Sequence, residues 1–230
     1  MNRHAKGGVS LMLTAPGGAA GGASVMVNYR LDDDGKLTIE HSAMADAPAP
    51  LRVHPHPYFN LNGDSGVGDH TLQIGADYFV EVDAMGAPVA VAAVDRTPFD
   101  FRQPAPIGAR LHWPDSQIRL RGEFDHCFFV RSHFDGGQGA LREVARVFDP
   151  GSGRRLQMFT TEAALQFCTG NRIAGQPNDV PAGPTRRRAG FGLGANPCPD
   201  LMSKPGPTSS CSQGRCIARP PSTGFRFSFR

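Results

Sequence analysis

The chain has 230 residues, a formal net charge of +3 and 40% hydrophobic residues. This length fits one large domain or two small ones, and the hydrophobic fraction excludes a chain that is disordered throughout. No nucleic-acid partner is expected, because binding would need clustered basic residues and the one basic run is Arg186–Arg188.

The first three quarters of the chain have the pattern of short strands, with turn signals between them at roughly ten-residue spacing. Asp32–Gly35 predicts a hairpin turn, whereas Ala15–Gly22 and Ala47–Leu51 predict unpaired segments. No long helix is predicted. This pattern favours an all-β fold, an antiparallel sandwich or barrel, over βαβ units. The predicted strands are Val9–Thr14, Ser24–Leu31, Lys36–Ser42, two strands within Thr71–Val82, Ile118–Leu120, His126–Arg131, Leu141–Phe148, Arg155–Thr160 and Leu165–Cys168.

The composition changes near Gln176. Nine of the 20 prolines lie between residues 176 and 224, and the alternation of apolar and polar residues is lost until Phe225–Phe229. We therefore divide the chain into a β-rich core at residues 1–175, a Pro/Gly/Ser/Arg-rich segment at 176–224 and a terminal strand within 225–230. A disordered segment is the simplest interpretation of 176–224.

The five cysteines predict no disulfide framework or zinc site, because their number is odd and no pair has CxxC spacing. Cys127 and Cys168 lie in apolar runs and are predicted to be buried thiols, which suggests a reducing compartment. The first residues contain no apolar stretch long enough for a signal peptide, and no segment has the apolar length of a membrane span. We expect a cytoplasmic protein with no membrane partner.

The segment His54–Gly63 concentrates two histidines, an aromatic pair and two asparagines between strands. His54 and His56 are two residues apart and would share one side of an extended chain, as a metal-ligand pair can, but no third ligand is evident nearby. A buried structural histidine is the second interpretation. A sugar site is the third, because aromatic faces cover pyranose C–H groups, amides bind hydroxyls and imidazole exchanges protons near neutral pH.

Two further polar residues lie on or beside apolar strands. Asp125 precedes a strand that must be interior, so it either caps a turn or binds a ligand. Gln166 alternates with Leu165 and Phe167 and therefore faces away from them, toward solvent or a ligand. Glu162 is predicted to lie in a solvated turn.

The order and spacing of these segments resemble the aldose 1-epimerase (galactose mutarotase) family over about residues 9 to 175. The family's signature of a His, one variable residue and Tyr-Phe-Asn-Leu-x-Gly is matched by His56–Gly63. The other family-like blocks are Asp69–Asp83, Thr97–Gly108, Phe124–Phe128, Ala145–Leu156 and Gln166–Asn171.

The resemblance implies a large antiparallel β-sandwich of the galactose mutarotase type, here incomplete. It implies interconversion of the α and β anomers of a free aldohexose, of the glucose or galactose class, by acid and base catalysis without metal or cofactor. His56 matches the family's general acid, Asp125 and Gln166 match its substrate-binding residues, and Tyr58 and Asn60 are further candidates for substrate contact.

The sequence departs from the family in three places. The family has a further N-terminal region, with a substrate-binding Arg and a second His, and without its strands we expect edges and one core face to be exposed. His54-Pro55 replaces the Thr-Asn that usually precedes the acid, and Arg52 stands where a small polar residue is usual. Gly194 stands where the family has its catalytic Glu.

These departures lead to further expectations. A compensated reading-frame shift is a second interpretation of the stretch from Gln176 to Pro221, because family-like sequence flanks it on both sides. We expect an aldose 1-epimerase of impaired activity. The alternatives are a carbohydrate-binding pseudoenzyme and a non-functional fragment. The sequence predicts no oligomeric state.

Overall fold

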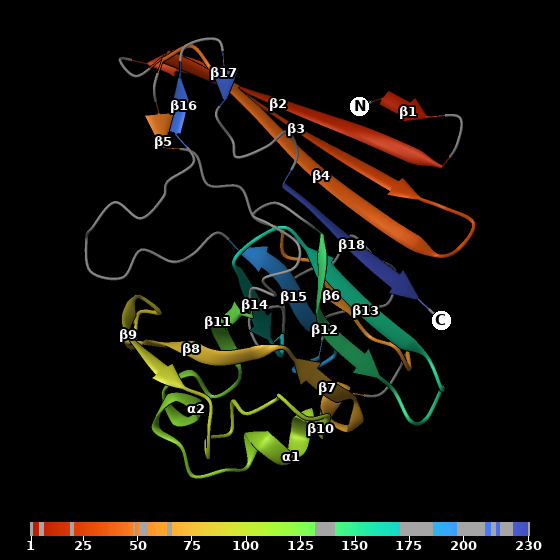
Figure 1. Cartoon of the computed structure of the whole chain (residues 1–230), viewed down its shortest axis with the longest axis vertical. Coiled ribbons are helices and arrows are strands. Elements are labelled where there is room, and N and C mark those ends of the chain that lie inside the picture. Colours follow the sequence, from red (N-terminus) through yellow and green to blue (C-terminus); the bar gives the residue numbers. More distant parts are fainter. Residues whose placement is uncertain are drawn as a thin grey trace.

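Two antiparallel sheets face one another and enclose the main hydrophobic core (Figure 1). This is a computed structural model of the chain, and it describes residues 2–4, 7–18, 21–47, 49–50, 55–63, 66–131, 141–170, 186–196, 210–212, 215–216 and 223–229. The prediction of a large antiparallel β-sandwich is confirmed.

The first sheet has nine strands, and the last strand of the chain lies in its middle. Phe227 of that strand is paired with Leu37 on one side and with Met158 on the other, so the two ends of the chain are joined within one sheet. In spatial order the strands are β1 (Asn2–His4), β2 (Gly8–Gly18), β3 (Gly21–Leu31), β4 (Lys36–Ala45), β18 (Thr223–Phe229), β13 (Arg155–Thr160), β12 (Arg142–Phe148), β7 (Thr71–Ile74) and β10 (Ala105–Pro106).

The second sheet has six strands, and three short strands form a separate small sheet. In spatial order the six are β6 (Tyr58–Phe59), β15 (Phe191–Asn196), β14 (Ala164–Cys168), β11 (Asp125–Val130), β8 (Ala76–Val82) and β9 (Pro88–Ala93). The small sheet consists of β17 (Arg215–Cys216), β16 (Ser210–Ser212) and β5 (Ala49–Pro50).

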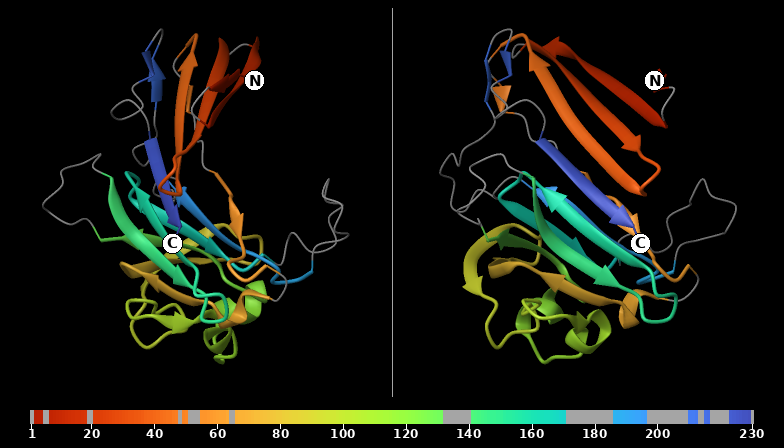
Figure 2. Two further views of the ribbon diagram at one scale, coloured as in Figure 1. Left: turned by 90° about the vertical axis from the view of Figure 1, so that its right-hand side faces the viewer. Right: turned by 45° about the vertical axis from the view of Figure 1, so that its right-hand side comes forward.

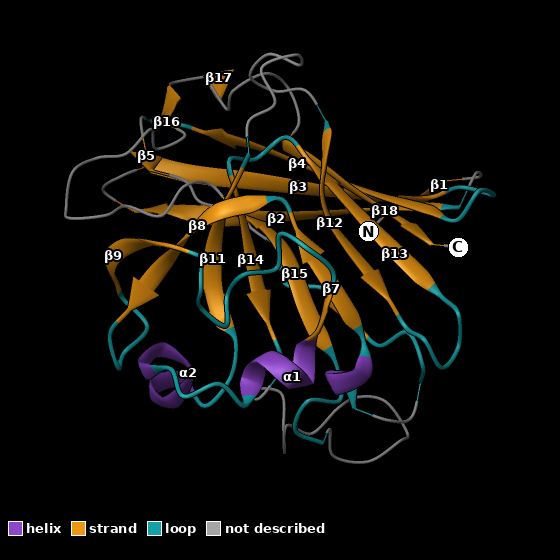
Figure 3. Ribbon diagram, turned by 60° about the horizontal axis from the view of Figure 1, so that its bottom comes forward, coloured by secondary structure: helices purple, strands orange, loops and turns teal. Residues whose placement is uncertain are grey.

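The helices are short and lie together at one end of the sandwich (Figure 3). They are the 3-10 turn η1 (Val67–Asp69), α1 (Ile107–Leu111) and α2 (Ser116–Arg121). In the part of the chain that the structure describes, no helix has the length and apolar character needed to cross a membrane.

Helix α2 corrects the prediction of a strand at Ile118–Leu120. The Asp115 carboxylate accepts hydrogen bonds from the backbone N–H groups of Gln117 and Ile118, at 2.8 and 3.3 Å, and so caps the first turn. Gly122 ends the helix in the left-handed conformation with φ 68°, which glycine adopts at low cost. The two capping residues outweigh the β-like composition of the short apolar run.

Three other strand predictions need correction. The predicted loop Ala15–Gly22 belongs largely to the β2–β3 hairpin, in which β2 continues to Gly18 and β3 begins at Gly21. Ala49 and Pro50, predicted to be unpaired, form β5 against β16. Strand β9 was not predicted, because it begins with Pro88; proline is tolerated here at the first residue of an edge strand.

Strand β15 lies within the segment 176–224, where alternation had seemed lost. Phe191, Leu193 and Ala195 are buried in the core and alternate with glycine. The strand pairs with β14 on one side and with β6 on the other. This part of the segment therefore belongs to the second sheet, and glycine between the apolar residues conceals its strand pattern.

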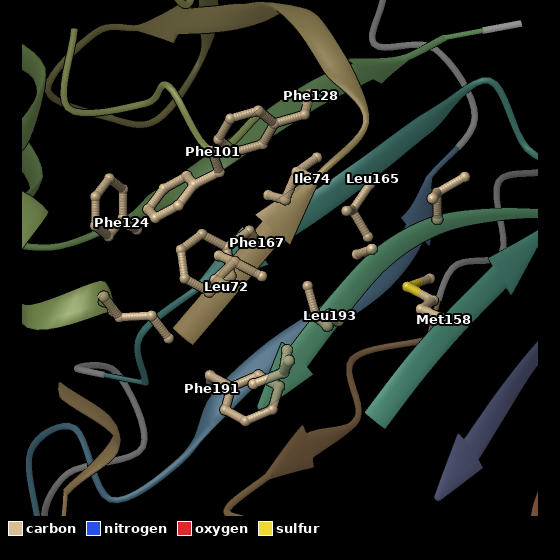
Figure 4. Close-up of a cluster of buried hydrophobic side chains, with 14 of the residues drawn as sticks. Leu72, Ile74, Phe101, Phe124, Phe128, Met158, Leu165, Phe167, Phe191 and Leu193 are labelled. Atoms are coloured by element: carbon tan, nitrogen blue, oxygen red, sulfur yellow. The ribbon is translucent and has the colours of Figure 1, made fainter. Parts of the chain in front are cut away.

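The core between the sheets is rich in phenylalanine (Figure 4). Phe128, Leu165 and Phe167 of the second sheet face Leu72 and Met158 of the first, and all are fully buried. Burial of one such side chain contributes about 1.5–3 kcal/mol, so this packing is the main source of stability of the sandwich.

Strands β2, β3 and β4 extend beyond the part of the first sheet that the second sheet covers (Figure 2). Leu13 and Ile39 lie on the same face of these strands, as their register shows, yet Leu13 is 71% exposed and Ile39 only 2%. The expected exposure of one apolar face is therefore seen here, in the strands farthest from the second sheet.

Two leucine substitutions test how much a buried and an exposed leucine contribute to stability. Leu193→Ala should lower the free energy of unfolding by about 2–5 kcal/mol, because Leu193 of β15 is fully buried. Leu13→Ala should change it by less than about 0.5 kcal/mol, because the side chain is already in solvent. Urea denaturation of both variants tests this; equal losses would show that β15 is not packed in the core or that Leu13 is covered.

Candidate active site

The polar residues predicted from the sequence gather on the outer face of the second sheet. Strands β11, β14 and β15 lie side by side, with Asp125 opposite Cys168 and Gln166 opposite Gly194 (Figure 1). Their neighbours Leu165 and Phe167 point into the core, so Asp125, Gln166 and Cys168 point away from it. Gln166 thus has the orientation that its alternation predicted.

Asp125 is held at both carboxylate oxygens. The Gln166 amide donates from Nε2 to Oδ1 over 2.9 Å, and the Arg121 guanidinium donates from Nη2 to Oδ2 over 2.6 Å. The Asp125 side chain is 20% exposed, so it still reaches solvent. Two predicted residues are therefore in direct contact, and the carboxylate has a fixed orientation at a partly open surface.

His126, the residue after Asp125, points into the core and fixes the backbone of the site. Its ring accepts the Asp125 N–H at Nδ1 over 3.1 Å, so the Nε2 proton is left to face Gln117 Oε1 at 3.2 Å. Burial lowers the pKa of His126 from its usual 6.5 to about 4, despite the nearby Asp125 charge. His126 is therefore neutral at pH 7, and its role is structural.

Tyr58 and Cys168 form a second pair on the same face. The Cys168 thiol lies 3.4 Å from the Tyr58 hydroxyl and donates to it. Burial, and then the contact with Cys168, raises the pKa of Tyr58, and burial also raises the pKa of Cys168. Both groups are therefore protonated at neutral pH. Tyr58 is 39% exposed and offers an aromatic face and a hydroxyl beside Asp125.

The segment that carries His56 lies over β15. A Cβ atom at Gly194 would overlap with the carbonyl oxygen of Pro55, and one at Gly192 would lie 3.6 Å from the carbonyl oxygen of Pro57. His56, between these two prolines, is exposed. The structure therefore places the His56 segment over the strand next to Gln166, on the face that carries Asp125.

Asn60 has a structural position. Its side-chain amide donates to the Ala189 carbonyl over 2.8 Å, and its Oδ1 accepts the Asn62 and Gly63 N–H groups at 3.0 and 3.2 Å. These are the contacts of an Asx turn. His70 supports the same loop, since its Nε2 accepts the Leu61 N–H over 3.0 Å and burial lowers its pKa.

The remaining predicted residues are placed as follows. Glu162 lies in the turn between β13 and β14, as predicted, and its N–H donates to Thr160 Oγ1 over 3.0 Å. His54 and Arg52 lie outside the described residues, so the histidine pair stays a prediction. Gly194 stands directly opposite Gln166 in the sheet.

Two residues of this face were not predicted. Arg121 could have been found only from its position four residues before Asp125, at the end of a helix that the sequence did not indicate. Cys168 was predicted to be a buried thiol, and burial is right, but its pairing with Tyr58 spans 110 positions and depends on the sheet.

Comparison with known sequences identifies the family. The profile described as aldose 1-epimerase matches residues 4–214. The chain belongs to the aldose 1-epimerase family. It is 37% identical to the aldose 1-epimerase of Escherichia coli K12 over 163 residues, which cover 70% of this chain and 46% of that protein. It is 34% identical to the human galactose mutarotase over 191 residues, which cover 82% of this chain and 53% of that protein.

Solved structures show the same fold. The aldose epimerase homologue of C. elegans superposes with a TM-score of 0.81 at 23% identity, over the whole of this chain and 67% of that one. The galactose 1-epimerase of Lactobacillus acidophilus gives 0.79 at 26% identity, over 97% of this chain and 62% of that one. The chain spans about half the length of the curated epimerases that it matches.

The neutral state of His126 predicts how stability depends on pH. In the unfolded chain His126 binds a proton near pH 6.5, whereas in the folded chain it does so only near pH 4. The free energy of unfolding therefore falls as the pH falls from about 6.5 to 4. The loss should reach about 3 kcal/mol. Urea denaturation between pH 7 and 4.5 measures it.

Substitution separates His126 from the other titrating groups. His126→Gln should reduce the dependence and leave part of it, because burial also lowers the pKa of His70. His112→Gln, at the exposed histidine that ends α1, is the surface control. An unchanged slope in His126→Gln would mean that another group is responsible.

Proposed function

We propose that this chain interconverts the α and β anomers of free aldohexoses, as an aldose 1-epimerase, at the outer face of β11, β14 and β15. In this reaction an acid protonates the ring oxygen while a base removes the proton of the C1 hydroxyl, and the C1–O5 bond breaks. Rotation about C1–C2 and closure from the other side give the second anomer, with the two proton transfers reversed.

The observation that carries the proposal is the direct contact between Asp125 and Gln166 beneath the segment that presents His56. A carboxylate accepts sugar hydroxyls, an amide both donates and accepts, and an exposed imidazole transfers protons near neutral pH. The exposed ring of Tyr58 adds an apolar surface of the kind that covers pyranose C–H groups.

His56 has the role of general acid in this proposal. Its position between Pro55 and Pro57 restricts the backbone on both sides, because each proline fixes φ and the residue before a proline is kept extended. The two prolines therefore limit the backbone freedom of His56 without a helix or a long strand to support it.

The base is the missing element, and we propose that turnover is slow for this reason. Gly194 stands opposite Gln166, and the Pro55 carbonyl oxygen occupies the space that a side chain at position 194 would enter. Water must then accept the proton of the C1 hydroxyl. Absence of a positioned base slows proton transfer by about a hundred- to ten-thousandfold.

The same glycine supports a second candidate function, sugar binding without turnover. In this alternative Asp125, Gln166 and Tyr58 contact the hexose, and glycine at position 194 offers no proton acceptor. Measurement of mutarotation beside a sugar titration separates this pseudoenzyme from a slow enzyme. A third alternative, a chain that does not fold stably alone, would give a broad thermal melt by circular dichroism.

We also propose that the protein works in the cytoplasm. Support comes from Cys168, whose buried thiol is in no disulfide, because an oxidising compartment favours paired cysteines. Fractionation of cells that produce the native protein tests this location.

The role of His56 is tested by polarimetry of fresh α-D-glucose. His56→Ala should lower the mutarotation rate above buffer by about a hundredfold or more, because the ring oxygen loses its proton donor. His112→Ala, at an exposed histidine of the same chain, should keep the rate of the parent protein. Equal rates in the parent protein and His56→Ala would reject His56 as the acid.

Restoring a carboxylate at position 194 tests the missing base. Gly194→Glu and Gly194→Ala both displace the Pro55 carbonyl, and only the first supplies a proton acceptor. The turnover number of Gly194→Glu should exceed that of Gly194→Ala by about a hundredfold or more. Equal turnover in the two variants, at equal sugar affinity, would show that this position does not carry the base.

A further inference from the structure

Arg121 lies at the junction between helix α2 and strand β11, directly beside Asp125. Its side chain is 9% exposed, and Nη2 donates to Asp125 Oδ2 over 2.6 Å. The contact depends on Gly122, which ends the helix in the left-handed conformation and directs the chain into β11. This turn brings Arg121 and Asp125, four residues apart in sequence, into contact. The pair is therefore formed by local structure at the start of the strand.

We propose that Arg121 is the positioning residue that fixes the orientation of the Asp125 carboxylate toward the sugar. This inference rests on the proposed function and adds a residue to it. Arg121 holds Oδ2 while Gln166 holds Oδ1, so the carboxylate cannot rotate about its last side-chain bond. The Asp125 side chain is 20% exposed, so a sugar hydroxyl can approach its carboxylate from solvent.

The guanidinium of Arg121 is not fully paired. Its Nε atom is buried and has no hydrogen-bond partner in the described part of the chain, as is also the case for Nε of Arg142 and Arg188. A donor left unpaired in this way is destabilising. The case for positioning therefore rests on the contact between Nη2 and Asp125 Oδ2.

The groups packed around the Arg121 guanidinium restrict its movement. A Cβ atom at Gly86, in the turn between β8 and β9, would lie 3.2 Å from Arg121 Nη1. Arg187 donates from Nη2 to the Gly122 carbonyl over 3.1 Å and so supports the same junction. Arg121 is therefore confined between this turn and Asp125, as a positioning residue needs to be.

The first experiment observes the carboxylate without sugar. The side-chain amide signals of Gln166, assigned by their loss in Gln166→Leu, report its hydrogen bond to Asp125. In Arg121→Met the carboxylate can rotate, so these signals should move toward the positions of a solvent-exposed amide. Arg119→Met, which removes an exposed charge from the same helix, should leave them unchanged.

The second experiment measures sugar binding and turnover in the same variants. Arg121→Met should raise the KM, or the Kd if turnover is undetectable, by about tenfold and change kcat by less than about threefold, because only hydroxyl binding is disturbed. Arg121→Lys should recover part of the affinity. In an Asp125→Asn background, Arg121→Met should have no further effect on affinity, since the two residues act as one unit.

The outcomes separate this proposal from the proposed function. Unchanged Gln166 signals in a folded Arg121→Met protein would overturn the positioning role whether or not sugar binds. Additive effects on affinity in the double variant would overturn it as well, because they would indicate packing alone.

If the parent protein neither binds nor interconverts the sugar, the proposed function fails, and the Gln166 signals still decide whether Arg121 orients Asp125. If Arg121→Met does not fold, the comparison is made with Arg121→Gln, which also removes the charge, and unchanged signals and affinity in that variant would again overturn the role.

Discussion

The aromatic core between the two sheets determines which way each residue of β11, β14 and β15 points. Phe128, Leu165 and Phe167 are fully buried against the first sheet, and side chains alternate along a strand. A shift of one residue in any of these strands would turn its apolar side chains into solvent. The packing of phenylalanine thus holds Asp125 and Gln166 on the outer face, although no phenylalanine takes part in the chemistry.

Burial also decides which groups of the site carry charge. His126 and Asp125 are adjacent in sequence, but the strand places the imidazole in the core, where it is neutral, and the carboxylate at the surface beside Arg121. Tyr58 and Cys168 stay protonated because burial disfavours their anions. The outer face therefore combines a carboxylate held by Arg121 and Gln166 with a protonated hydroxyl and a protonated thiol.

Two further features of this chain bear on the proposed function. It spans about half of the length of the family members that it matches, and Leu13 of β2 is 71% exposed. On the outer face of the second sheet, the Pro55 carbonyl oxygen lies against Gly194, so the segment that carries His56 packs directly on β15. In the proposed function, this backbone contact occupies the position at which a base is expected.

The sequence by itself determined the class of fold, most of the strands and the outward orientation of Gln166. Alternation of apolar and polar residues was enough for these predictions, because every second residue of a strand with one buried side is apolar. Four features were decided only by the tertiary structure: helix α2, strand β15, the Tyr58–Cys168 pair and the Arg121–Asp125 contact. Helix α2 depends on caps at two single residues, and the core-facing pattern of β15 is interrupted by glycines. The Tyr58–Cys168 contact depends on the pairing of strands, and the Arg121–Asp125 contact depends on the left-handed Gly122. Hydrophobic periodicity predicts neither of them.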